Sequence, residues 1–213
     1  MRTLPLWVII PVKPLDEAKS RLATSLSPEQ RALLARELLT HTLQVVGQVP
    51  AVTQVMVLTR QPGPVDLVAD RAVQLVEEIG NAGLNPALLA AAHLAIEQGA
   101  QAVLILPADL PMLAVGDLER LVALADPPPV VVVAPDRHHE GTNALLCAPP
   151  SLIEYQFGPE SLRLHQAQAR LAGARLEVCD LPGLALDIDL PEDLDLLRSQ
   201  GPDFLPPDLG LTG

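Results

Sequence analysis

The chain is 213 residues long, with 49% hydrophobic and only 2% aromatic residues. This length and composition predict one globular domain with an aliphatic core, and they exclude a disordered chain. The net charge of −12 argues against proteins that bind nucleic acids or anionic membranes, so any anionic substrate needs a local cluster of positive charge.

The first 135 residues alternate between predicted strands and helices. Apolar, β-branched runs predict strands at 6–12, 52–59, 73–77 and 102–106. A helix is predicted after the N-cap Ser27, because Pro28 suits the first helical position and Gln30 completes a capping box. Further helices are predicted at 65–71, at 86–98 with Asn85 as N-cap, and at 115–125. Such alternation is typical of a parallel sheet with helices on both faces.

The rest of the chain predicts a change of direction within the sheet. Strands are predicted at 130–134, 143–147, 176–179 and 184–188, and helices at 159–172 and 191–199. Because no helix separates the strands at 130–134 and 143–147, we expect a mixed edge. We therefore predict an α/β fold in which residues 1–200 form a single domain with a mostly parallel central sheet. The Pro- and Gly-rich tail, residues 201–213, is expected to be loosely ordered.

Two further sequence features indicate a cytoplasmic protein. No apolar run approaches the roughly 20 residues that cross a bilayer, and residues 1–13 lack the pattern of a signal peptide. Cys147 and Cys179 fit no metal-binding spacing, so we expect both to be reduced, buried thiols.

The loop after the first strand concentrates positive charge in an otherwise acidic chain. Of the 14 basic residues only Lys13 and Lys19 are lysines, and both lie in this loop together with Arg21. Lysine is a compact point charge suited to phosphate, and open α/β sheets bind ligands at the carboxyl ends of their strands. The loop is therefore predicted to bind a triphosphate. It lacks the spacing of a P-loop, and a solvated loop with ordinary charges is the alternative interpretation.

Three aspartates are candidates for a metal site. Asp109 lies between two prolines directly after a predicted strand, and Asp187 and Asp189 would share one face of another. Neighbouring carboxylates repel each other unless a cation lies between them. Mg²⁺ commonly takes one or two carboxylates together with substrate phosphates. Alternatively, Asp109 belongs to a turn and Asp189 caps the following helix.

A second polar region lies between residues 135 and 165. Thr142 offers a hydroxyl beside a glycine, and Gly158 and Ser161 lie at the start of a predicted helix, where backbone amides bind anions. His165 follows one turn after Ser161, so it either faces the same ligand or is a partly buried helix histidine. The adjacent histidines at 138–139 point apart and are interpreted as surface residues.

Taken together, the chain resembles the 2-phospho-L-lactate guanylyltransferase family of deazaflavin (F-420 type) coenzyme biosynthesis, whose bacterial relatives use phosphoenolpyruvate. Six segments carry the resemblance, in the family's order: PVKPLDEAKSRLA, GLN at 83–85, LPADLP, GTNALL, FGPESLRLH and LDIDLPEDL. They cover nearly the whole chain. The resemblance implies a nucleotidyltransferase fold, Rossmann-like and of the GT-A type, as in molybdenum-cofactor guanylyltransferases. It also implies Mg²⁺-dependent transfer of GMP from GTP to the phosphate of phosphoenolpyruvate or 2-phospho-L-lactate, with release of pyrophosphate.

The resemblance also implies roles for individual residues. The triphosphate would be bound by Lys13, Lys19 and Arg21, which act in catalysis together with Asp109. The guanosine would be approached by Gly83 and Asn85. The phosphoacid would be held by Thr142, Gly158 and Ser161, with His165 beside them. The metal would be bound by Asp109, Asp187 and Asp189.

Two departures from related enzymes leave part of this interpretation open. Many relatives carry Asp-x-Asp where this chain has Pro107 before Asp109, and the familiar glycine-rich nucleotide loop is replaced by the lysine-rich one. The same fold could serve another acceptor, such as molybdopterin or a sugar phosphate, or bind GTP without turnover. The sequence does not choose between phosphoenolpyruvate, 2-phospho-L-lactate and 3-phosphoglycerate, nor between a monomer and a homodimer.

Overall fold

The structure is a three-layered α/β domain built on a seven-stranded sheet. The computed structural model describes residues 4–15, 17–60, 73–78, 83–200, 205–206 and 209. The strands are β1 (Leu6–Val12), β2 (Val52–Thr59), β3 (Val73–Glu77), β4 (Ala102–Ile105), β5 (Val130–Pro135), β6 (Thr142–Ala148) and β7 (Arg175–Val178). The helices are α1 (Pro28–Val46), α3 (Leu84–Glu97), α4 (Val115–Ala123), α5 (Ser161–Leu171), α6 (Pro182–Ala185), α7 (Pro191–Gln200) and a 3₁₀ turn (Ser20–Leu22).

The strand order β3-β2-β1-β4-β6-β5-β7 places a topological switch point between β1 and β4. From β1 the chain moves outward to β2 and β3, and then returns to place β4 on the other side of β1. In open α/β sheets the carboxyl ends of the strands at such a point form the ligand crevice. The topology thus selects the ends of β1 and β4, where Lys13 and Asp109 lie, as the place for a site.

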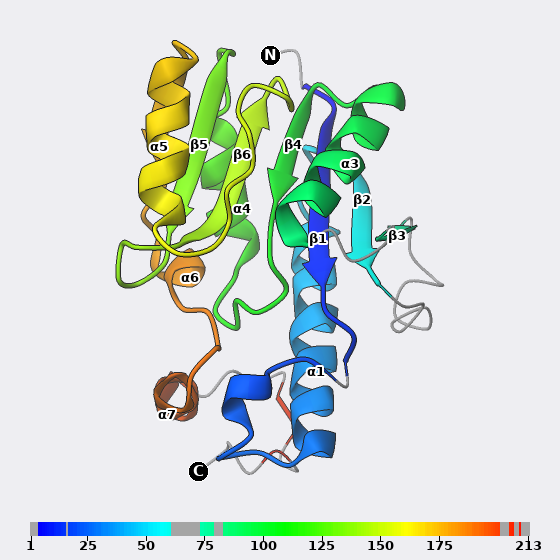
Figure 1. The fold of residues 1–213 in the computed structure, drawn as a ribbon, viewed down its shortest axis with the longest axis vertical. Coiled ribbons are helices and arrows are strands. Elements are labelled where there is room, and N and C mark those ends of the chain that lie inside the picture. Colours follow the sequence, from blue (N-terminus) through cyan, green and yellow to red (C-terminus); the bar gives the residue numbers. More distant parts are fainter. Residues whose placement is uncertain are drawn as a thin grey trace.

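The antiparallel strand lies inside the sheet and not at its edge. β6 pairs antiparallel with both β4 and β5, and β7 pairs parallel with β5 as the outer strand. The expected mixed edge was therefore misplaced by one strand, because β7 adds to β5 and covers it. As β6 runs against its neighbours, its first residues lie at the edge where β4 ends, next to the crevice (Figure 1).

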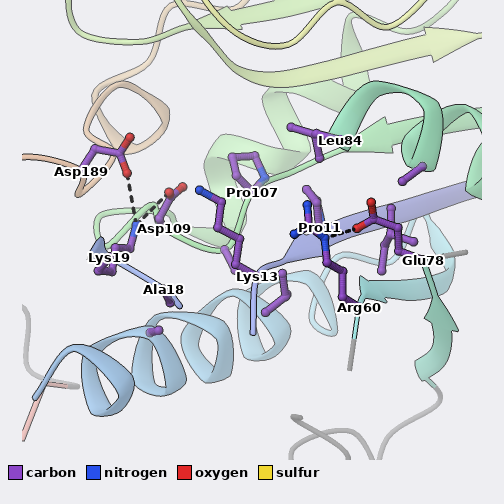
Figure 2. A pocket seen from close by; sticks show the side chains of 15 residues that line it. Pro11, Lys13, Ala18, Lys19, Arg60, Glu78, Leu84, Pro107, Asp109 and Asp189 are labelled. Carbon is purple, nitrogen blue, oxygen red and sulfur yellow. Dashed lines mark hydrogen bonds and ion pairs between the residues drawn. The ribbon is translucent and has the colours of Figure 1, made fainter. Parts of the chain in front are cut away.

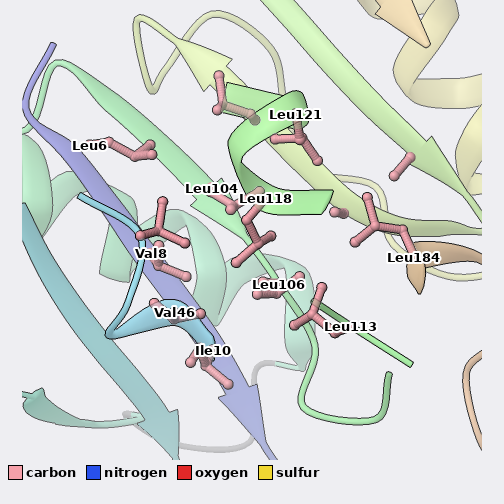
Figure 3. Packing of buried hydrophobic residues seen from close by; sticks show 14 of the residues in the cluster. Leu6, Val8, Ile10, Val46, Leu104, Leu106, Leu113, Leu118, Leu121 and Leu184 are labelled. Carbon is pink, nitrogen blue, oxygen red and sulfur yellow. The ribbon is translucent and has the colours of Figure 1, made fainter. Parts of the chain in front are cut away.

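Helices cover both faces of the sheet, as predicted. One face packs against α1 and α4 around an aliphatic cluster that includes Leu6, Val8, Leu104, Leu118 and Leu121 (Figure 3). The other face packs against α3 and α5 (Figure 1). Each fully buried aliphatic side chain contributes roughly 1.5–3 kcal/mol. The near absence of aromatic residues is therefore compensated by many interlocking Leu, Val and Ala side chains.

A third hydrophobic cluster lies beyond the carboxyl edge of the sheet. It joins the 3₁₀ turn, the first half of α1, α7 and the segment before α7, and its members include Leu22, Leu38 and Ile188. Leu205 and Leu209 are also buried in it, so the expectation of a loosely ordered tail is wrong for these two residues. This cluster fixes the lysine-rich loop against the segment that carries Asp187 and Asp189.

Several local predictions are confirmed and two are wrong. Ser27 and Gln30 form the predicted capping box of α1. The strand expected at 184–188 is absent: α6 occupies its first residues, and the rest pairs with no strand of the described sheet. Asn85 is not an N-cap, because α3 begins at Leu84. The helix expected at 65–71 lies outside the described residues. None of the helices within the described part is long and apolar enough to cross a membrane.

Candidate active site

An elongated cleft opens at the carboxyl ends of β1, β2 and β4. Figure 2 shows Lys19, Asp109 and Asp189 gathered at one end of the cleft and the Arg60–Glu78 pair at the other. Between them the walls are apolar and include Pro11, Leu58, Leu84, Ala87 and Pro107. The cleft therefore offers charge at both ends and a hydrophobic surface between them.

Lys19 is the central cation of this cleft. Its ammonium group lies 2.9 Å from Asp109 Oδ2 and 3.7 Å from Asp189 Oδ1. The side chain is only 9% exposed, so this is a largely desolvated ion pair, held where solvent screening is weak. Lys19 also has a left-handed backbone with φ of 54°. Such a conformation is uncommon for a non-glycine residue and concentrates at functional sites.

The two other predicted triphosphate ligands, Lys13 and Arg21, are placed differently from Lys19. Lys13 lies just beyond the end of β1 and lines the cleft, and among the described residues it has no ion-pair partner. Within the described ranges Arg21 pairs only with Asp189, at 3.5 Å, and its side chain is 70% exposed. Of these three cations, Lys13 is therefore the one without an ion-pair partner among the described residues, whereas Lys19 already balances carboxylates.

The segments that carry the three predicted carboxylates do lie together, although residues 187–189 do not form a strand. The amide of Ile188 donates a hydrogen bond to the carbonyl of Asp109, with a distance of 3.1 Å, and so ties residues 187–189 to the end of β4. The Asp193 carboxylate accepts hydrogen bonds from the amides of Asp189 and Leu190. This fixes Asp189 beside Lys19.

Asp187 lies in a pocket that disfavours its charge. Its Oδ1 accepts a hydrogen bond from Asn143 Nδ2 at 3.3 Å. Burial raises the pKa of Asp187 to about 6, and the negative charge of Asp109 adds to the rise. A cation placed beside Asp109 and Asp187 would favour the charged form of Asp187 and so lower its pKa again.

The chemistry of Asp109 and Asp187 suits a divalent cation, although the described residues form no complete metal site. Asp109 Oδ1 is buried and has no hydrogen-bond partner within the described part of the protein. A buried carboxylate oxygen without a partner is costly unless a ligand completes it. No three His, Cys, Asp or Glu side chains among the described residues converge as a ready-made metal site. Asp189 pairs instead with Lys19 and Arg21, so the three-aspartate metal site stays a prediction.

A second, smaller pocket adjoins the cleft on the β6 side. Thr142, Asn143, Phe157 and Asp187 line it, and Asp109 belongs to the walls of both pockets. The loop before β6 is folded by Asp136, whose carboxylate accepts three backbone amides, including that of Gly141. A side chain at Gly141 would place its Cβ 2.7 Å from that carboxylate, so Asp136 would have to move away from the amides it accepts.

The hydroxyl of Thr142 is oriented by His165. His165 Nε2 accepts a hydrogen bond from the amide of Gln156, so the ring proton lies on Nδ1, which is 3.0 Å from Thr142 Oγ1. Thr142 therefore accepts this bond and keeps its own hydroxyl hydrogen for the pocket. Burial lowers the pKa of His165 to about 4, which keeps the ring neutral. The structure thus assigns the histidine an orienting position behind Thr142.

The buried His165 predicts a pH-dependent stability. An unfolded chain takes up a proton on this ring near pH 6.5, whereas the folded protein does so only near pH 4. Between these values the unfolded state binds more protons, so the free energy of unfolding should fall by up to about 3 kcal/mol as pH is lowered from 6.5 to 4.

Urea unfolding across this pH range tests this prediction. The His165→Gln variant should lose this part of the pH dependence, whereas His93→Gln, which changes an exposed histidine, should retain it. An unchanged pH slope in His165→Gln would contradict the buried neutral ring.

The remaining predicted ligands lie beside the pockets. The Asn85 side chain bonds both the amide and the carbonyl of Phe157, at 2.8 and 3.0 Å, so it joins α3 to the loop before α5. Gly158 (φ 132°) and the buried Ser161 follow Phe157 at the start of α5, outside the residues that line either pocket. The guanosine roles of Gly83 and Asn85, and the phosphoacid roles of Gly158 and Ser161, stay predictions.

Sequence reasoning missed several polar residues of this region. Arg60 and Glu78 each follow a correctly predicted strand, so their position at a carboxyl end was a usable signal. Asn143, Arg137 and Asp193 act through contacts between distant segments. Asn143 bonds the carbonyls of Leu184 and Ala185, and Arg137 pairs with Asp193 at 2.6 Å. No pattern of neighbouring residues in the sequence indicates such contacts.

Solved nucleotidyltransferases share this fold. Solved structures with the same fold include a nucleotidyl transferase from a Methanothermobacter species, with a TM-score of 0.64, 16% identity and coverage of 92% of this chain and 97% of that one. Another is 4-diphosphocytidyl-2C-methyl-D-erythritol synthase from Anaerococcus prevotii, with a TM-score of 0.65, 9% identity and coverage of 93% and 96%. Residues 6–203 match the family described as guanylyl transferase CofC like, and the chain belongs to this family.

Curated relatives refine this assignment. The phosphoenolpyruvate guanylyltransferase of Sphaerobacter thermophilus is 39% identical over 194 residues, which cover 91% of this chain and 93% of that protein. The 3-phospho-D-glycerate guanylyltransferase of Colwellia psychrerythraea is 34% identical over 190 residues, covering 89% and 90%. The family resemblance inferred from the six sequence segments is therefore confirmed.

Proposed function

We propose that this protein transfers GMP from GTP to the phosphate of phosphoenolpyruvate and releases pyrophosphate. The observation that carries the proposal is the sharing of Asp109 by two adjoining pockets. One is long with charged groups at both ends, and the other is smaller and adds Thr142, Asn143 and Asp187 to a largely apolar lining. A nucleotide in the long cleft and a phosphoacid in the small pocket would meet at this residue. The names of the Sphaerobacter and Conexibacter relatives support phosphoenolpyruvate as the acid.

The charged residues at the meeting point fit an in-line phosphoryl substitution. An oxygen of the acid's phosphate attacks the α-phosphorus of GTP, and the bond from that phosphorus to the bridging oxygen breaks, so that pyrophosphate leaves with the electron pair. Such a reaction needs positioning and charge neutralisation more than covalent chemistry. Lys13 would hold the leaving phosphates, and Lys19 would keep Asp109 and Asp189 in place.

The acid is held from the side of β6 in this proposal. The hydroxyl of Thr142, oriented by His165, donates to an oxygen of the phosphoacid. Asp109 and Asp187 would hold Mg²⁺, which when bound neutralises phosphate charge between them. A product of this kind belongs to F-420-type coenzyme synthesis, and we place the activity in the cytoplasm.

The proposal is tested by incubating the purified protein with GTP, Mg²⁺ and one phosphoacid at a time. The acids are phosphoenolpyruvate, 2-phospho-L-lactate and 3-phosphoglycerate, with pyrophosphatase present and products identified by mass spectrometry. A guanylyl adduct of phosphoenolpyruvate is expected. If an adduct forms instead with another of the acids, or with molybdopterin or a sugar phosphate, that compound would replace phosphoenolpyruvate as the proposed acceptor. GTP binding without any adduct would overturn the enzymatic proposal in favour of a GTP-binding protein.

A further inference from the structure

We propose that Glu78, supported by Arg60, selects guanine as the base of the nucleotide. The inference rests on the proposed function in so far as the long cleft is taken to hold a nucleoside triphosphate. It goes beyond that function because it assigns base selection to particular side chains. The position, the hydrogen bonding and the surroundings of the pair support it separately.

The pair lies at the correct end of the cleft for a base. Arg60 follows β2 and Glu78 follows β3, and the amide of Glu78 donates to the carbonyl of Thr59 at 2.8 Å, which holds the two strand ends together. Both side chains line the cleft at the end opposite Lys19 and Asp109 (Figure 2). With the phosphates near the lysines, the base of an extended nucleotide falls beside Arg60 and Glu78.

Glu78 has one acceptor atom that no described residue uses. Its side chain is only 10% exposed, and Oε2 accepts a hydrogen bond from Arg60 Nε at 3.0 Å. Oε1 is buried and has no hydrogen-bond partner within the described residues. Leaving a buried carboxylate oxygen without a donor costs free energy, so this oxygen is suited to a ligand that brings donors.

The donor pattern of guanine matches the pair. Guanine presents two neighbouring donors, N1–H and the 2-amino group, followed by the acceptor O6. A carboxylate accepts only, and a guanidinium donates only. Glu78 would accept from the two donors, and the remaining N–H groups of Arg60 would face O6. Adenine would instead place its N1 acceptor against the carboxylate, and mismatches of this kind are rejected strongly.

The walls beside the pair suit a flat ring. Leu58 and Leu84 line the cleft, and Leu84 keeps 44% of its surface exposed although it is a large apolar side chain. A base lying over this surface would bury it while its polar edge meets Glu78. The cleft therefore combines an apolar face with one polar edge, which is the usual arrangement of a selective small-molecule site.

The Glu78→Gln variant tests this inference with two nucleotides. A glutamine amide can still accept from N1–H, but its NH₂ group opposes the 2-amino group of guanine and matches the 2-oxo group of xanthine. We expect the affinity for GTP to fall about 10- to 100-fold and the affinity for XTP to rise, so that the preference inverts. A structural defect would weaken both nucleotides and could not create the gain.

Binding and turnover are both measured, so that the two proposals fail separately. Equilibrium binding of GTP and XTP needs no acceptor, and an inverted preference there supports the role of Glu78 even if no adduct forms. The neighbouring exposed Glu77→Gln serves as the matched control and should keep the wild-type ratio. Arg60→Gln should weaken the binding of GTP and of ITP equally, because both bases carry O6. An unchanged GTP-to-XTP ratio in a folded Glu78→Gln protein would overturn the inference.

Discussion

Asp109→Asn is expected to lower the rate of guanylyl transfer by at least about 100-fold, because the substitution removes the charge shared by both pockets. Asparagine has nearly the same shape and keeps one oxygen, so the loss would come from charge and not from packing. The free energy of unfolding should fall by no more than about 1–3 kcal/mol, because Lys19 loses a partner in a poorly solvated place but keeps Asp189 at 3.7 Å. Removal of the Asp109 charge weakens the pair with Lys19 but also relieves the repulsion that raises the pKa of Asp187.

Single-turnover kinetics and urea unfolding separate these effects. Asp195→Asn serves as the matched control, because Asp195 lies on α7, is 74% exposed and pairs only with Arg198 among the described residues. It should retain both activity and stability. Near-normal transfer by Asp109→Asn would remove Asp109 from the reaction centre, and with it the main support for a metal between Asp109 and Asp187.

Lys19→Gln is expected to reduce both activity and stability. The variant leaves Asp109 without its partner at 2.9 Å, although that carboxylate is only 24% exposed. Removing one partner of a poorly solvated ion pair leaves an uncompensated charge, so we expect the protein to lose about 1–3 kcal/mol of stability. The rate should fall at least about 100-fold, since the remaining carboxylates would repel the phosphates of both substrates.

The double variant Lys19→Gln/Asp109→Asn distinguishes a structural from a catalytic role. Because both charges are then absent, stability should recover toward that of the wild type, whereas activity should not. Arg170→Gln, which removes an exposed charge on α5, is the control for a simple change in net charge. If the double variant regained activity as well, Lys19 and Asp109 would serve only to hold the loop and the strand end together.

Elements with a strong local signal could be predicted from the sequence. The buried strand β1 and the capping box at Ser27 each depend on residues that are neighbours in the sequence, and both are present in the structure. The segment around Asp187 could not be predicted in this way. Its alternation of apolar and polar residues is typical of a strand. In the structure, however, the Asn143 side chain donates hydrogen bonds to the carbonyls of Leu184 and Ala185, and the amide of Ile188 donates to the carbonyl of Asp109. Tertiary contacts override the local pattern there.

The same division applies to the candidate site: some of its residues could be predicted from neighbouring sequence, and those placed by contacts between distant segments could not. Residues at strand ends, such as Lys13 and Asp109, follow from the rule that ligands meet the carboxyl edge of the sheet. The predicted role of Asn85 did not anticipate its contact with Phe157, because that contact joins residues 72 positions apart. The orientation of Thr142 by His165 likewise depends on the packing of α5 against the sheet.

The reversed strand β6 would separate the two halves of substrate recognition that we propose. The groups proposed to hold the nucleotide come from β1, β2, β3 and β4, whereas Thr142 and Asn143 enter at the amino end of β6. In the proposed complex, the stretch between the end of β5 and the start of α5 therefore supplies those acceptor contacts that the nucleotide cleft does not share. Exchange of this stretch between relatives named for different phosphoacids would change the acceptor while leaving the nucleotide half untouched. A family of enzymes can diversify in this way by altering one connection of its sheet.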